Sequence, residues 1–264
     1  MNKQHPFANL CKWITAGVVL FLVLPLITMI VFSFSKKIEV IPSELTLKWY
    51  GFIGHDALAA IGISFMISLP AILIALLVSL PLAYVMTRTD FPGKKLIDQL
   101  IILPALIPGT VFGLSLLQLF NTGFFRGTPP LLVLILAHTA VVVPVMARPI
   151  LAAMEQLGSK LEEAAETLGA TPIQAFLGVT FPLISSSIVV GMIFGFARSI
   201  NDFIMTFFLM TPDLVPLSIR IFTSTYLSVP QITAANAVVL VTMSVGVVLL
   251  AERCYGGPHC QDTK

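Results

Sequence analysis

Three polar residues at the end of an apolar run are the first candidates for chemistry in this sequence. Arg198, Asn201 and Asp202 lie close together, with the arginine and the aspartate four residues apart. Ionisable groups are costly inside apolar segments, so they are candidates for contacts with a polar solute. Asp202 and Asn201 could attract an ammonium group, whereas Arg198 suits an anionic or zwitterionic solute. Residues four apart share a helix face, however, so Arg198 and Asp202 could instead simply neutralise each other.

Two other places hold residue types that could bind a ligand. His138 lies within an apolar run, where we favour a hydrogen bond between helices over a contact with a solute. Cys254, His259 and Cys260 are potential metal ligands, but their spacing matches no usual zinc pattern. We therefore expect a disordered tail over 252–264 and no metal site. The three cysteines lie near the two ends of the chain and suggest no disulfide framework.

No catalytic set accompanies these residues. The sequence contains no H-E-x-x-H, no G-x-S-x-G and no pair of aspartates in separate apolar segments. Gly158-Ser159-Lys160 lacks the spacing of a phosphate-binding loop, so we expect no nucleotide site and no cofactor in this chain. An intramembrane enzyme and a secondary transporter or channel stay as alternatives. The latter would call for internal repeats or several intramembrane charges, which are not evident.

Composition indicates that the elements positioning these residues lie in lipid. Hydrophobic residues make up 57% of the 264 residues and charged residues 11%, against about 25% charged in soluble domains. The mean hydropathy is +0.97. The net charge of +2 is too small to indicate a nucleic-acid partner. These values exclude a disordered chain and an ordinary soluble enzyme.

Six stretches free of Asp, Glu, Lys and Arg are long enough for a membrane-spanning helix, which needs about 20 apolar residues. They are 13–35, 57–87, 99–125, 127–147, 167–197 and 221–251. The sequence therefore predicts an all-α polytopic membrane protein, a single domain over 1–264. Nine of the 15 Lys and Arg residues lie on the cytoplasmic side if both ends of the chain are inside, which is the expected bias.

The boundaries of several spans need adjustment. We expect the fifth helix to begin near Phe181 and the sixth near Ile232, because prolines and polar residues precede them. The short apolar run 203–210 could end the fifth helix or form a re-entrant turn. The first run is longer than the 7–15 apolar residues of a signal peptide and lacks a small-x-small cleavage site, so we expect a retained helix.

Two pairs of glycines indicate where helices pack closely. Gly109 and Gly113 are four residues apart, as are Gly191 and Gly195. Small residues at this spacing let helix backbones approach each other in lipid. We interpret them as packing faces that say nothing about a solute.

The segment 148–182 between the fourth and fifth spans is too long for a tight hairpin. Apolar residues recur there at helical spacing, and three acids are expected on the opposite face. The apolar residues are Leu157, Leu161, Ala165 and Leu168, and the acids are Glu162, Glu163 and Glu166. Gly169 supplies a helix stop, and Thr171-Pro172-Ile173-Gln174 predicts a capping box at the start of a second helix. The segment should form an elbow of two helices.

This elbow could insert into a groove on a partner protein or rest on the membrane surface. Surface helices are usually basic on their polar face, whereas this one is acidic and would be repelled by anionic headgroups. We therefore favour docking to a partner.

The same segment resembles the EAA loop of ATP-binding-cassette importer permeases. Glu163-Ala164-Ala165 is followed after three residues by Gly169, and after nine more by Val179-Thr180-Phe181-Pro182. The family pattern has isoleucine and leucine where this chain has Val179 and Phe181. The resemblance extends over about 57–251, the six-helix core of type I importer permeases.

Within that class, two segments resemble permeases of the spermidine/putrescine type. They are Ser199-Ile200-Asn201-Asp202-Phe203 and Leu214-Val215-Pro216-Leu217. Asn201 stands where those permeases often have an acid, and Val215 where they have threonine. Permeases for other small solutes, such as aminoethylphosphonate, share this pattern.

The resemblance implies a pore subunit in a bacterial inner membrane. It implies a dimer of cytoplasmic ATPases, a second permease subunit, identical or homologous, and an extracytoplasmic solute-binding protein. Glu163 would pair with a basic group of the ATPase, Ala164 and Ala165 would allow close approach, and Gly169 would make the turn. Pro182 completes the pattern. ATP would be bound by the partner and not by this chain.

Overall fold

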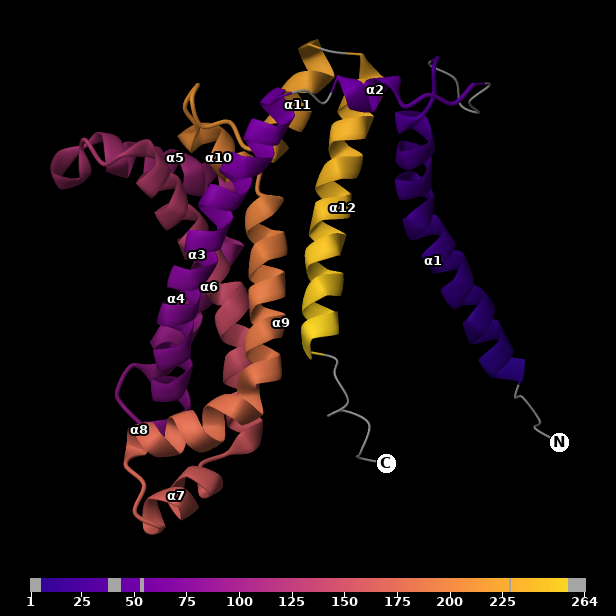
Figure 1. The fold of residues 1–264 in the computed structure, drawn as a ribbon. Coiled ribbons are helices and arrows are strands. Elements are labelled where there is room, and N and C mark those ends of the chain that lie inside the picture. The colour runs from indigo at the N-terminus through magenta and orange to yellow at the C-terminus, as the bar shows by residue number, and fades with distance from the viewer. Residues whose placement is uncertain (1–5, 38–43, 53–54, 228, 256–264) are drawn as a thin grey trace. The chain divides into compact units, whose positions relative to one another are not determined.

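The computed structural model describes residues 6–37, 44–52, 55–227 and 229–255, in which the regular secondary structure is helical (Figure 1). The chain divides into two compact units. The first unit contains Met1–Leu58 and Arg220–Val241, and the second contains Ala59–Ile219 and Thr242–Lys264. The predicted tail 252–264 lies outside the described residues from 256 onward, and the last helix runs up to Tyr255.

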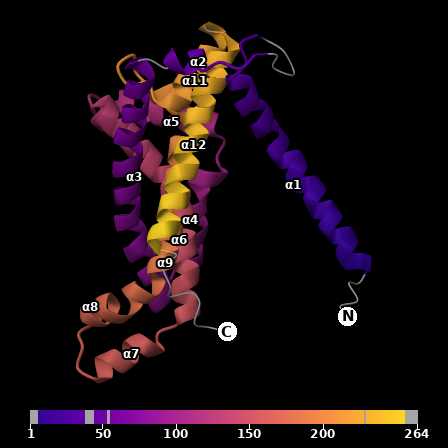
Figure 2. The same cartoon turned by 45° about the vertical axis from the view of Figure 1, so that its right-hand side comes forward.

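The second unit holds the helices that carry the predicted site residues. In chain order they are α3 (His55–Arg88), α4 (Lys94–Leu106), α5 (Gly109–Asn121), η1 (Gly123–Phe125), α6 (Pro130–Leu157), α7 (Lys160–Thr167), α8 (Pro172–Ala175), η2 (Phe176–Thr180), α9 (Phe181–Ile200) and α10 (Ile204–Leu209). The η2 segment is a π-helical turn, so that α8, η2 and α9 form one continuous helix. In both views α7 and α8 lie at one end of α6 and α9 (Figure 1, Figure 2).

The first unit is built from α1 (Pro6–Ser33), α2 (Lys48–Gly51), and parts of α11 (Leu217–Leu227) and α12 (Pro230–Tyr255). Polar contacts hold α2 against the end of α1. The Tyr50 and Ser33 hydroxyls lie 2.7 Å apart, and Trp49 Nε1 donates to the Ser35 carbonyl at 2.7 Å.

Five helices among the described residues are long and apolar enough to cross a membrane, and α4 with α5 make a sixth candidate if the two are one broken span. The all-α, membrane-spanning prediction is confirmed. The third predicted span is not one continuous helix, because α4 and α5 are bent by 100° at a short break. Ile107 in the break is extended, with φ −70° and ψ 133°. The following proline disfavours the helical conformation at Ile107, which explains the break.

Other boundaries also differ from the prediction. The fourth helix continues about ten residues past the apolar run, to Leu157. Arg148 lies within this helix and does not end it, because its guanidinium pairs with the Asp98 carboxylate at 3.0 Å. The run 203–210 forms the separate short helix α10. The helices α9 and α12 begin at Phe181 and Pro230, close to the expected positions, although the continuous candidate span that contains α9 begins at Pro172.

The glycine pairs mark close helix packing, as predicted. A Cβ atom on Gly195 would lie 2.8 Å from Val142 Cγ1, and one on Gly191 would lie 3.1 Å from the Met146 carbonyl oxygen, so α9 packs directly on α6. Gly109 and Gly113 bring α5 against α10 in the same way. Buried apolar residues of α3, α6 and α10 form a common core. They are Ile67, Val133, Leu134, Ala137, Val141, Met205 and Leu209.

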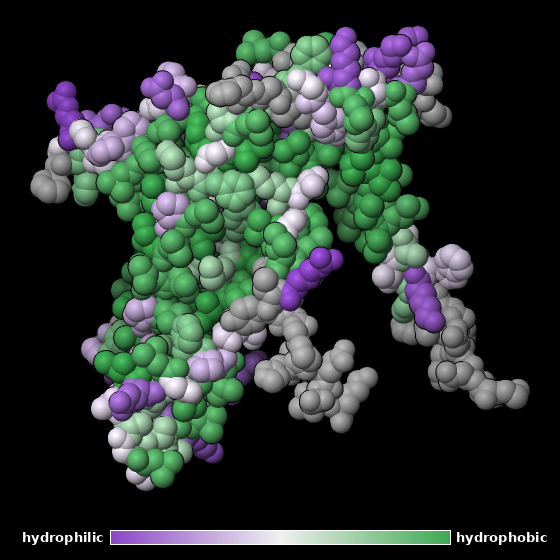
Figure 3. Space-filling model, viewed as in Figure 1, coloured by the Kyte–Doolittle hydropathy of each residue, from purple (hydrophilic) through white to green (hydrophobic). Residues whose placement is uncertain are grey.

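The outer surface of the second unit is apolar, as a lipid-facing surface must be. Leu69, Leu73 and Leu77 on one side of α3 are all more than half exposed. The face shown in Figure 3 is mostly green over the long helices. Such a surface would aggregate in water and is stable in a bilayer.

Candidate functional site

The elbow, residues 158–180, has the two-helix geometry that its sequence predicts. Gly158 ends α6 with φ +67°, and Gly169 ends α7 with φ +96°; both values suit glycine and strain other residues. Thr171 and Gln174 form the predicted capping box, with the Thr171 amide donating to Gln174 Oε1 at 2.9 Å. The chain then continues through α8 and η2 into α9, so the elbow is joined to α6 and α9 through the backbone.

The elbow presents the predicted coupling residues at its surface. Glu163 and Ala164 are exposed and Ala165 is half-buried. Leu168 is 90% exposed, and Leu161 and Ile173 are exposed as well. The apolar face therefore finds no cover within the described part of this chain. An uncovered apolar face beside free carboxylates fits a groove on a partner protein.

The prediction of an acidic face is wrong for one of its three glutamates. Glu163 and Glu166 are exposed, but Glu162 is buried. Its carboxylate accepts hydrogen bonds from Arg88 Nε at 2.9 Å and Arg88 Nη2 at 3.3 Å. The helical turn points adjacent side chains about 100° apart, which separates Glu162 from Glu163. The one sign of this pairing in the sequence was the position of Arg88, directly after the apolar run 57–87.

A cluster of buried polar side chains, here the polar cluster, joins α3, α6, α9 and α10. His138 lies at its centre, with Nδ1 2.8 Å from Ser199 Oγ and Nε2 3.0 Å from Thr206 Oγ1. Ser199 Oγ lies 2.8 Å from Ser68 Oγ. The interpretation of His138 as a hydrogen-bonding partner between helices is confirmed. The serines and Thr206, which complete the network, were not singled out by the sequence, because single hydroxyls in apolar runs give no distinctive pattern.

The Arg198–Asp202 pair borders the polar cluster. Arg198 Nη1 lies 2.6 Å from Asp202 Oδ1, and the aspartate also accepts from the Thr206 amide at 3.2 Å. The Asp202 side chain is 6% exposed and that of Arg198 is 37% exposed. Arg198 and Asp202 therefore neutralise each other, and the Asp202 carboxylate is the buried member of the pair. Asn201 is exposed and donates to the Ala197 carbonyl at 2.8 Å, so it lies apart from the polar cluster.

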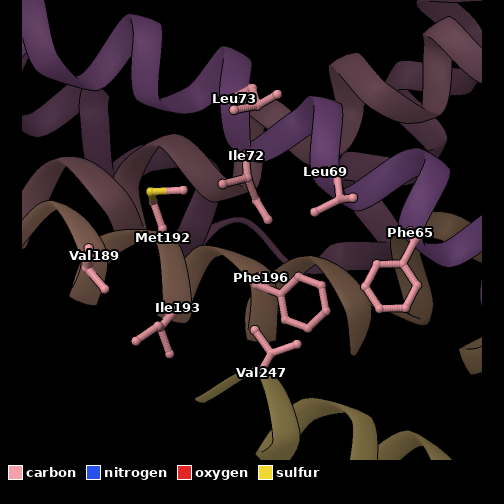
Figure 4. Close-up of a pocket in the computed structure, with 9 residues that line it drawn as sticks. All are labelled: Phe65, Leu69, Ile72, Leu73, Val189, Met192, Ile193, Phe196 and Val247. Atoms are coloured by element: carbon pink, nitrogen blue, oxygen red, sulfur yellow. The ribbon is translucent and has the colours of Figure 1, made fainter. Parts of the chain in front are cut away.

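Two cavities differ in what they could hold. The polar cluster borders a cavity of about 10 Å³, enough for about one water molecule, which Ser64, Asp202 and Ser218 also line. A larger cavity of about 360 Å³ lies between α3 and α9, and its side chains show only carbon and sulfur (Figure 4). The larger space offers no partner to a polar solute, so the polar cluster is the better candidate for a solute path.

The predicted residues thus form two groups at opposite ends of one helix. Glu163, Ala164, Ala165 and Gly169 lie on the elbow, and Pro182 lies in the first turn of α9. Arg198 and Asp202 lie at the other end of α9. The 20 residues of α9 separate the groups by about 30 Å. No group of three potential metal ligands occurs in the described ranges; His259 and Cys260 lie outside them.

The sequence matches the model of a known family. Residues 75–252 match the binding-protein-dependent transport system inner membrane component family. The chain is 30% identical over 229 residues to the putrescine transport system permease protein PotI of Escherichia coli K12, covering 83% of this chain and 82% of PotI. It is 37% identical over 132 residues to the sulfate transport system permease protein CysT of that organism, covering 46% and 48%. It is 35% identical over 159 residues to the molybdenum transport system permease protein ModB of that organism, covering 52% and 67%.

Solved structures share the fold. A bacterial ABC transporter involved in the import of the acidic polysaccharide alginate aligns with a TM-score of 0.67 at 16% identity, covering 98% of this chain and 99% of that one. A bacterial alginate ABC transporter in complex with its pentasaccharide-bound periplasmic protein aligns with a TM-score of 0.71 at 17% identity, covering 92% of both chains. At these identities the likeness extends to the fold alone.

Proposed function

The chain belongs to the family of binding-protein-dependent transport system inner membrane components, and on this premise we propose that it imports a polyamine of the spermidine or putrescine type. It is a multi-pass permease component of an ABC importer, and it is not an enzyme: ATP hydrolysis belongs to a partner. The inner membrane of a bacterium is the proposed location.

The polyamine assignment rests on the identity to PotI over most of both chains. The site chemistry supports it, because the buried Asp202 carboxylate at the edge of the polar cluster is a partner for an ammonium group. The hydroxyl oxygens of the polar cluster could accept hydrogen bonds from further N–H groups of a polyamine.

The elbow is the proposed docking element for a cytoplasmic ATPase. Its exposed apolar residues would enter a cleft of the ATPase, and the exposed Glu163 would pair with a basic side chain there. A second permease subunit would complete the pore, and an extracytoplasmic binding protein would deliver the solute. A firmly folded elbow can transmit ATPase closure to α6 and α9 as a rigid-body movement.

An anionic or zwitterionic solute, such as aminoethylphosphonate, is the second candidate. CysT and ModB are named for sulfate and molybdenum transport, and each aligns with about half of this chain. Arg198 is also the more exposed member of its ion pair, so its guanidinium is the charge that a solute would meet first.

Uptake by the reconstituted transporter tests the proposal. The permease, its ATPase, its second permease and its binding protein are placed in liposomes, and ATP-driven uptake of radiolabelled putrescine, spermidine, sulfate, molybdate and aminoethylphosphonate is measured. We expect saturable uptake of a polyamine that unlabelled sulfate does not inhibit. Transport of an oxyanion or a phosphonate without transport of polyamines would replace the first candidate with the second.

A further inference from the structure

One buried ion pair lies where α3 meets the elbow. Arg88 is the last residue of α3, and Glu162 lies in α7, 74 residues later. Their side chains are 9% and 8% exposed, and Arg88 makes two hydrogen bonds to the carboxylate. The Arg148–Asp98 pair, which also joins distant segments of the described chain, is far more exposed, with side chains 41% and 42% exposed.

Two further groups complete this junction. The Thr180 hydroxyl at the end of η2 donates to Glu162 Oε1, and Arg88 Nη1 donates to the Met154 carbonyl of α6 at 3.4 Å. Thr180 is fully buried. Four segments, α3, α6, α7 and η2, therefore meet at one carboxylate and one guanidinium.

Backbone connectivity explains why such a junction is needed. The elbow is continuous with α6 through Gly158 and with α9 through η2, so both helices must follow it. By contrast, α3 continues into α4 and has no backbone link to the elbow. Residues of α3, α8 and η2 also line an open apolar groove of about 330 Å³, beside which the Tyr84 and Phe176 rings are in edge contact with their centroids 5.3 Å apart. Apolar contacts are non-directional, whereas a bidentate, buried ion pair specifies one arrangement.

The far end of α3 shows what such a link would move. Ser68 of α3 contacts Ser199 in the polar cluster, and Ser64 accepts a hydrogen bond from the Leu217 amide at 2.9 Å. Ser68 lies 20 residues before Arg88, or about 30 Å along the helix. A shift of the elbow that reached α9 alone would pull Ser199 away from Ser68.

We propose that Arg88, Glu162 and Thr180 are positioning residues that make α3 move together with the elbow. A movement of the ATPase would then shift both α3 and α9, the helices that contribute Ser68 and Ser199 to the polar cluster. This inference rests on the proposed function. It gives two adjacent residues different roles: Glu162 pairs with Arg88 of α3 within the subunit, and the exposed Glu163 contacts the ATPase.

Coupling in the reconstituted transporter is the first test. Glu162→Gln and Arg88→Gln are compared with Glu155→Gln, which removes an exposed charge near the end of α6. For both junction variants we expect normal co-purification of the ATPase and ATP hydrolysis within about twofold of wild type. Uptake per ATP hydrolysed should fall at least about tenfold. Glu155→Gln should behave as wild type.

A distance measurement separates coupling from simple stabilisation. Spin labels at Leu77 on α3 and Leu177 in η2 of the elbow, both more than half exposed and neither among the docking residues named above, report the distance between the two elements with and without ATP. We expect one narrow distribution in each state for the wild type and a broadened distribution for Glu162→Gln. Thr180→Val removes one hydrogen bond without unpairing a charge, and it should lower uptake per ATP about two- to fivefold, which keeps the test available if the charge variants do not assemble.

The outcomes distinguish the two proposals. Failure of the wild-type chain to bind any ATPase would overturn the proposed function. Normal ATPase binding, with wild-type coupling and narrow distances in Glu162→Gln or Thr180→Val, would overturn the junction alone. Equal losses of ATPase binding and uptake in every junction variant would show a purely structural role and would also overturn it.

Discussion

At the scale of single residues, environment separates side chains of the same type. Glu162 and Glu163 are neighbours, yet one carboxylate is enclosed by Arg88 and Thr180 and the other is exposed. Asp202 is likewise enclosed, by Arg198 and Thr206, whereas the neighbouring Asn201 faces outward. Under the proposed function, an ammonium group of the solute would replace Arg198 as the partner of the Asp202 carboxylate, because the Arg198 side chain is 37% exposed.

Asp202→Asn tests the solute path at this scale. The amide keeps one acceptor for Thr206 but loses the charge, so uptake of a polyamine should fall at least about tenfold. Assembly with the ATPase should be unchanged, because the residue lies about 30 Å from the elbow along α9. Asp213→Asn, at an exposed turn position, is the control. Wild-type uptake kinetics in Asp202→Asn would remove this residue from the path.

At the scale of elements, the elbow depends on two turns that only glycine makes without strain. Gly169 has φ +96°, and a Cβ there would meet no atom within 4 Å, so the cost of a substitution lies in the backbone and not in a clash. Such a conformation costs a non-glycine residue about 1–3 kcal/mol. The elbow can relieve this cost by letting α7 and α8 change their relative direction.

Gly169→Asp should therefore disrupt the elbow without unfolding the spans. We expect co-purification of the ATPase and ATP-driven uptake to fall at least about tenfold, whereas helix content by circular dichroism stays near wild type. Gly62→Ala is the control: that glycine is helical with open space around it, and alanine should stabilise the helix by up to about 1 kcal/mol. ATPase binding by Gly169→Asp at the wild-type level would contradict docking through this elbow.

At the scale of the whole molecule, the chain is a set of spans whose ends must lie on defined sides of the membrane. The Lys and Arg distribution predicts that both termini and the elbow lie inside the cell and that Leu227, at the end of α11, lies outside. This arrangement is required if the elbow is to meet a cytoplasmic ATPase.

Thiol labelling of intact cells tests this orientation. In a chain whose three cysteines are replaced by serine and that is expressed without its ATPase, Leu227→Cys should react with a membrane-impermeant maleimide, whereas Leu168→Cys should react only after the cells are opened. Both leucines are at least 85% exposed, so accessibility of the side chain is matched. Labelling of Leu168→Cys from outside would invert the topology and remove the basis for ATPase docking.

Local patterns in the sequence were enough to predict the spans and the elbow. Helix starts and stops depend on a few neighbouring residues, as at Gly169 and Thr171, and insertion into lipid depends on the length of an apolar run. The pairing of Glu162 with Arg88 and the contacts of His138 were decided by the tertiary structure, because these partners come from helices more than 60 residues away in the sequence. The face of α7 that is buried depends on the position of Arg88 in the folded chain, and the sequence of the elbow does not predict that position. The break between α4 and α5 has a local cause in Pro108, but its 100° bend also depends on the packing of α5 against α10.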